Sequence, residues 1–121
     1  KKKKNRLICL AGYMKIISAY FIKKFNGNIL NIHPSLLPKY KGLSTHKKVI
    51  ENKDKYSGFT IHLVNKQVDS GKIIFQKKIK VLKNDDPKKL EKRILKGENK
   101  FYPIKISEYI SNLQKRNLSQ S

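Results

Sequence analysis

The chain has few of the residues on which metal centres and disulfides are built. Its one thiol, Cys9, excludes a disulfide within the chain and a metal site made of several cysteines, and it favours a reducing compartment such as the cytoplasm. The three histidines have no matching carboxylate or cysteine spacing, so no metal is expected. No apolar run approaches the roughly 18 residues that span a bilayer, and no membrane partner is expected.

Two catalytic signatures are also missing. The chain has no phosphate loop of the Gly-x-x-x-x-Gly-Lys type and no Gly-x-Ser-x-Gly elbow, which argues against nucleotide hydrolysis and serine-esterase chemistry. The chain starts at Lys1 and enters a short apolar segment at residues 7–10 with no preceding helix or strand. We therefore predict one domain, residues 1–121, that lacks its N-terminal half.

Negative charge is scarce, because 29 Lys and Arg stand against 8 Asp and Glu, a formal net charge of +21. Such a balance attracts polyanions non-specifically. The lysines are spread over nearly every predicted surface, and the aromatic residues fall mostly at core positions, without the stacking platform of a nucleic-acid groove. Small molecules are favoured as partners, with no specific nucleic acid, while a non-catalytic basic module stays open as an alternative.

Strand and helix patterns alternate along the chain. We expect Ser44 to cap one helix, Asp86 and Pro87 to begin another, and Gly97 to interrupt that second helix. The alternation predicts an α/β fold with a mostly parallel sheet, an antiparallel strand near one edge and flanking helices. The expected strands are 7–10, 28–33, 58–64 and 73–82, and the expected helices are 19–26, 45–52, one from 87 and one at 101–113.

The segment at residues 31–38, NIHPSLLP, carries the strongest chemical signal. Side chains alternate along a strand, so Asn31 and His33 share one face near the strand's carboxyl end, where open α/β sheets hold ligands. Asp69 lies between two strands beside a glycine and could orient a proton-transferring histidine. In the alternative interpretation, Asn31 and His33 satisfy backbone groups and Asp69 forms an Asx-turn.

Two other histidines are less distinctive. His62 falls on the same strand face as Thr60 and either lines a cleft or is a satisfied sheet residue. His46 is favoured as a helix-end residue over a ligand.

Four segments stand in the order and at the spacing of one family: residues 10–17, 31–38, 42–46 and 68–74. On these motifs, residues 7–110 resemble the carboxyl-terminal portion of the folate-dependent phosphoribosylglycinamide formyltransferases. The resemblance implies a Rossmann-like fold. It also implies formyl transfer from 10-formyltetrahydrofolate to the amino group of glycinamide ribonucleotide in purine biosynthesis, without a metal.

The resemblance further assigns roles. His33 would be the general acid/base, Asn31 would hydrogen-bond the developing oxyanion, and Asp69 would orient His33 and raise its pKa. Folate would contact the loop residues Met14, Lys15, Ile16 and Ile17 and the second loop Asn65, Lys66, Gln67, Val68 and Asp69. The ribonucleotide would contact Asn31 and the segment Leu95, Lys96, Gly97 and Glu98, of which Glu98 is favoured.

Some residues depart from the family pattern. The family's glycine-rich loop that grips the substrate phosphate has no counterpart here. Asn99 stands where the family usually has histidine, and Ser44 stands where many members have histidine or asparagine. Two relatives with the same fold are alternatives. Methionyl-tRNA formyltransferase is disfavoured by residues 42–46, and formyltetrahydrofolate hydrolase by Pro34.

Overall fold

The structure is a computed structural model that describes residues 7–10, 28–64 and 71–120, with side chains as far as residue 115. The expected helix at 19–26 and both predicted folate loops, 14–17 and 65–69, lie outside the described residues. The described elements are β1 (Leu7–Leu10), β2 (Asn28–His33), α2 (Thr45–Glu51), β3 (Tyr56–Leu63), β4 (Ile73–Lys80) and α3 (Pro87–Gln120).

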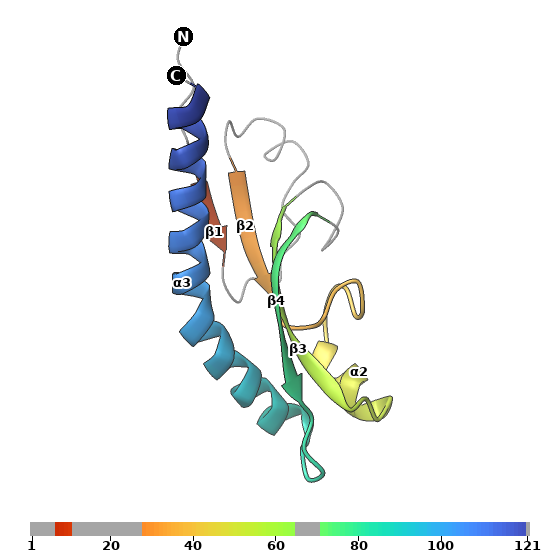
Figure 1. The fold of residues 1–121 in the computed structure, drawn as a ribbon. Coiled ribbons are helices and arrows are strands. Elements are labelled where there is room, and N and C mark those ends of the chain that lie inside the picture. Colours follow the sequence, from red (N-terminus) through yellow and green to blue (C-terminus); the bar gives the residue numbers. More distant parts are fainter. Residues whose placement is uncertain (1–6, 11–27, 65–70, 121) are drawn as a thin grey trace.

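The four strands form one mixed sheet in the order β1-β2-β3-β4, and α3 runs along it (Figure 1). β1 and β2 are parallel, whereas β3 is antiparallel to both β2 and β4. The α/β class and the antiparallel β4 were expected, but the antiparallel β3 corrects the predicted βαβ unit and makes the described sheet less parallel than predicted. Between β2 and β3 the chain forms only the seven-residue helix α2, which rises about 10 Å, roughly half the length of β2.

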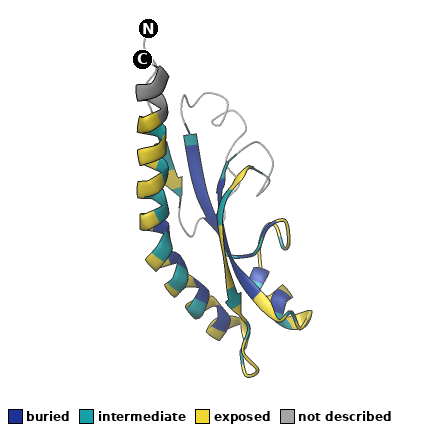
Figure 2. Ribbon diagram, viewed as in Figure 1, coloured by how far each residue is buried: buried dark blue, intermediate teal, exposed yellow. Residues whose placement is uncertain are grey.

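The core lies between the sheet and α3. β2 is buried along almost its whole length, while the outer side of α3 is exposed (Figure 2). As the alternation predicts, one face of β2 and β3 supplies the core and the other carries the polar residues. The buried cluster consists of Leu30, Ile32, Val49, Phe59, Ile61, Leu90, Ile94 and Tyr102.

Helix α3 corrects the prediction of two helices broken at Gly97, because it runs without interruption through that residue. A Cβ at Gly97 would lie 3.2 Å from the Phe59 ring and 3.3 Å from Ile79 Cδ1. The glycine therefore permits close packing on the sheet, a tertiary requirement that a sequence pattern does not distinguish from a helix break. Leu95, predicted as part of the apolar stripe, is 47% exposed. None of the described helices could cross a membrane.

The two predicted helix caps have different outcomes. The Lys89 amide donates to Asp86 Oδ1 at 2.8 Å, which confirms Asp86 as the cap of α3. Ser44 stands at the N-cap position of α2 but makes no side-chain capping bond, and its φ of 60° is left-handed. The predicted capping bond is therefore wrong there.

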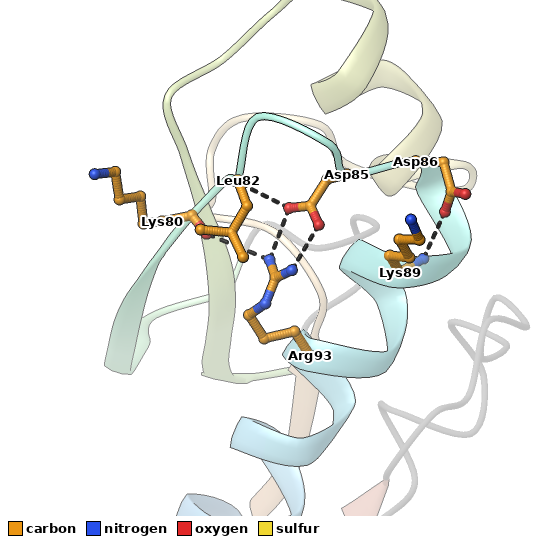
Figure 3. A network of polar contacts seen from close by, with 6 residues as sticks. All are labelled: Lys80, Leu82, Asp85, Asp86, Lys89 and Arg93. Atoms are coloured by element: carbon orange, nitrogen blue, oxygen red, sulfur yellow. Dashed lines mark hydrogen bonds and ion pairs between the residues drawn. The ribbon is translucent and has the colours of Figure 1, made fainter.

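The turn between β4 and α3 is fastened by an ion pair (Figure 3). Arg93 donates from Nη1 and Nη2 to the two carboxylate oxygens of Asp85, at 2.7 and 2.5 Å. The same carboxylate accepts the Leu82 amide at 2.7 Å. The pKa of Asp85 is lowered chiefly by the Arg93 hydrogen bond, so this carboxylate is held ionised at the mouth of the turn.

Candidate functional site

Asn31 and His33 lie on one face of β2, as the sequence predicts. In the register of the sheet, Asn31 stands opposite His62 and His33 opposite Thr60. Asn31 is 9% exposed and His33 is 2% exposed. Four polar side chains from two strands therefore share a buried patch on the face away from the core cluster.

The Asn31 amide is not fully satisfied by the described residues. Its Oδ1 is buried, and no described group forms a hydrogen bond with it. A buried polar atom without a partner costs about 1–3 kcal/mol. A ligand that donates a hydrogen bond to this Oδ1 would recover that cost, which makes Asn31 a candidate contact for a substrate.

The ring of His33 is held by the loop that follows β2. Its Nε2 lies 2.8 Å from the carbonyl oxygen of Tyr40. A carbonyl can only accept, so Nε2 must carry a proton and donate it in this bond. The structure thereby defines the protonation of one of the two ring nitrogens.

Two threonines fix the start of that loop. Thr60 Oγ1 donates to the Ser35 carbonyl at 2.7 Å and accepts the Leu37 amide at 3.0 Å. Thr45 Oγ1, at the start of α2, donates to the Pro34 carbonyl at 2.9 Å. Neither threonine was predicted to have a role, although the alternation of β3 does place Thr60 on the face of His62.

Of the other two histidines, His62 belongs to this patch and His46 lies near it. His62 is 2% exposed, and its Nδ1 lies 3.1 Å from the Leu63 carbonyl. His46 lies in the first turn of α2, the helix-end position that was favoured. Burial lowers the pKa of His46, Glu91 opposes this, and the charge of His33 lowers it further. His46 is therefore within electrostatic reach of His33.

The predicted ribonucleotide contacts on α3 do not share one environment. Leu95 and Lys96 are exposed and Gly97 is half-buried, whereas Glu98 is 7% exposed. Burial raises the pKa of Glu98 to about 7. One turn further on, the Tyr102 hydroxyl donates to the Leu10 carbonyl at 2.5 Å, which fixes this part of α3 against the end of β1.

The third member of the predicted catalytic set, Asp69, lies outside the described residues, as do all the predicted folate contacts. Within residues 7–10, 28–64 and 71–115, no three His, Cys, Asp or Glu side chains are grouped so that they could hold a metal ion. The described part of the site thus consists of Asn31 and His33, with the threonines and the loop behind them.

An open α/β sheet with an amide and an imidazole at the carboxyl end of a strand defines a class of ligand-binding fold. Comparison with known proteins identifies the family within this class. The sequence profile described as "Formyl transferase" matches residues 1–106. The phosphoribosylglycinamide formyltransferase of Haemophilus influenzae is 48% identical over 100 residues, which are 83% of this chain and 47% of that protein. The human trifunctional purine biosynthetic protein adenosine-3 is 42% identical over 100 residues, 83% of this chain and 10% of that protein.

Solved structures agree with these matches. The crystal structure of phosphoribosylglycinamide formyltransferase from Bacillus halodurans matches with a TM-score of 0.82 and 34% identity, covering 87% of this chain and 54% of that one. The enzyme from Brucella melitensis matches with a TM-score of 0.77 and 44% identity, covering 85% and 53%. The chain belongs to the formyl transferase family. It spans about half the length of the bacterial relatives that it matches.

Proposed function

We propose that this chain forms the catalytic portion of a phosphoribosylglycinamide formyltransferase, which moves a formyl group from 10-formyltetrahydrofolate to the amino group of glycinamide ribonucleotide. The observation that carries this proposal is the shared buried face of Asn31 and His33 at the end of β2, in a chain 48% identical to a protein of that name. Purine biosynthesis is the corresponding pathway.

The two described side chains suit this chemistry. Attack of an amine on a formyl carbon gives a tetrahedral intermediate with a negative oxygen, and one preorganised donor at that oxygen contributes about 3 kcal/mol. The Asn31 amide is the proposed donor. His33 is the proposed general acid/base, a role worth about 10²–10⁴-fold in rate. Asp69, in the segment between β3 and β4, is proposed to orient His33.

The remaining contacts are proposed from the family resemblance and from one property of Glu98. Residues 14–17 and 65–69 would hold the folate co-substrate. Because burial raises the pKa of Glu98 to about 7, its carboxyl keeps a proton to higher pH than an exposed glutamate, so it can donate to a substrate oxygen as well as accept from a substrate hydroxyl. No step of this reaction requires a metal or a covalent enzyme intermediate.

The test uses this chain joined to the portion of the Haemophilus influenzae relative that lies outside the match. Loss of the formyl group from the folate is followed with glycinamide ribonucleotide, methionyl-tRNA or water as acceptor. We expect transfer to the ribonucleotide, and His33→Ala should lower kcat at least about 100-fold with little change in folate binding. The exposed Lys41→Ala variant is the matched control and should keep full activity.

Each acceptor of the formyl group tests for the activity of a different member of the family. Preferred transfer to methionyl-tRNA, or formate release without an acceptor, would replace the proposed function with that of another member of the family. Undiminished turnover of His33→Ala would refute the role of His33.

A further inference from the structure

The residue that holds His33, Tyr40, has a constrained backbone. Its φ of 55° lies in the left-handed region, which side chains other than glycine rarely adopt. In this conformation its carbonyl oxygen accepts from two side chains, His33 Nε2 at 2.8 Å and Ser35 Oγ at 3.3 Å. Ser35 is fully buried and also donates to the Lys39 carbonyl at 2.6 Å. The turn is thus organised around the imidazole.

The hydroxyl of Tyr40 is anchored on the other side of the loop. It donates to Asp54 Oδ2 at 2.7 Å and accepts from Asn52 Nδ2 at 2.8 Å. Both partners stand just after α2. One tyrosine therefore links His33, through its backbone carbonyl, to the turn after α2, through its side chain.

That anchor is itself fixed by the end of α2. The Asp54 amide donates to the Val49 carbonyl at 3.1 Å, and the Lys53 amide donates to the Ile50 carbonyl at 3.1 Å. Lys53 has a φ of 54°, so the chain turns sharply there. The Asp54 carboxylate is consequently held at a set place relative to α2 and β3.

We propose that Tyr40 and Asp54 are positioning residues for formyl transfer, which hold the His33 ring by keeping the proton of neutral His33 on Nε2. The inference rests on the proposed function of His33. It follows from the geometry because the Tyr40 carbonyl can accept only from a protonated Nε2, and because the hydroxyl bond to Asp54 fixes where that carbonyl points.

The first test measures the His33 tautomer directly, by ¹⁵N NMR of the imidazole in the full chain. We expect the Nε2–H form to predominate in the native sequence. Tyr40→Phe removes the hydroxyl anchor and should lower the ratio of Nε2–H to Nδ1–H at least about threefold, the change that corresponds to losing part of one hydrogen bond. Tyr56→Phe, in which an exposed ring beneath Lys78 is altered instead, is the matched control and should leave the ratio unchanged.

A second pair of variants keeps the test decisive if Tyr40→Phe fails to fold. Asp54→Ala should lower the tautomer ratio, whereas Asp54→Asn retains an oxygen that accepts the Tyr40 hydroxyl and should restore most of it. A predominant Nδ1–H form in the native chain would overturn the proposal. So would equal ratios in Asp54→Ala, Asp54→Asn and the native chain.

Kinetics separate this inference from the proposed function. In the joined enzyme described above, Tyr40→Phe should lower kcat about tenfold with KM for the ribonucleotide nearly unchanged, and Asp54→Asn should recover kcat. If the variants change the tautomer ratio but the joined enzyme never transfers a formyl group, the proposed function alone would be refuted. If the variants transfer the formyl group at the full rate with an unchanged tautomer ratio, the positioning role of Tyr40 and Asp54 alone would be refuted.

Discussion

Among the described residues, a polar network around Tyr40 differs in character from one around Asp85. Around Tyr40, the His33 imidazole and the Ser35 hydroxyl donate to the Tyr40 carbonyl. The Tyr40 hydroxyl accepts from the Asn52 amide and donates to the Asp54 carboxylate, so the network runs from that carboxylate to the buried ring of His33. Around Asp85, a charged pair closes the turn between β4 and α3 and involves no histidine. The first arrangement defines where a proton sits, and the second defines where the chain turns. Similar bond lengths therefore serve different purposes.

The largest stability effect is expected from Asp85→Ala. The substitution removes both Arg93 bonds and the acceptor of the Leu82 amide, so we expect a loss of about 2–3 kcal/mol in the free energy of unfolding, measured in urea. The His33 tautomer should stay unchanged, because the turn lies outside the Tyr40 network. Asp86→Ala, which removes the cap of α3, is the comparison and should cost about 1 kcal/mol.

The same variant has a defined pH dependence. The folded pKa of Asp85 is lowered, so the native state gains stability above the unfolded pKa and loses it as pH falls through the folded value. The difference between native chain and Asp85→Ala should accordingly shrink below about pH 4. A difference that stays constant down to pH 2 would show that the charge of Asp85 contributes nothing.

Glu98 extends the comparison, because its carboxyl is buried and its pKa moves in the opposite direction to that of Asp85. The unfolded chain binds fewer protons than the folded one between pH 4.5 and about 7, so stability should fall as pH rises through that window. Glu98→Gln should remove this slope and raise the free energy of unfolding at pH 8 by about 1–2 kcal/mol. Urea titrations at pH 5 and pH 8 measure both quantities, and parallel curves for the two proteins would contradict the assignment.

Local patterns in the sequence predicted much of the fold. The alternation in β2 correctly predicted which side chains face the core and which accompany Asn31 and His33. Asp86 and Pro87 correctly marked the start of α3. These features depend on neighbouring residues, which a sequence displays directly.

Features that depend on distant contacts were not predicted. In the sequence alone, Gly97 indicates a helix break. In the fold, its lack of a side chain lets the Phe59 ring pack closely against α3, and the helix continues through it. The Tyr40 carbonyl on His33 depends on a left-handed backbone at a tyrosine, for which no residue type is a reliable marker.

The smallest effect is expected from removing the charge of Lys39, which pairs with Asp54 in the Tyr40 network. Lys39 Nζ lies 3.5 Å from Asp54 Oδ2, but its side chain is 62% exposed, so solvent screens the pair. Lys39→Met should change the free energy of unfolding by less than about 0.5 kcal/mol and should leave the His33 tautomer as it is. The reason is that the Tyr40 hydroxyl, and not the ammonium group, joins Asp54 to the loop. If Lys39→Met shifted the tautomer as far as Tyr40→Phe, charge and not hydrogen bonding would organise both networks, and the contrast between them would fail.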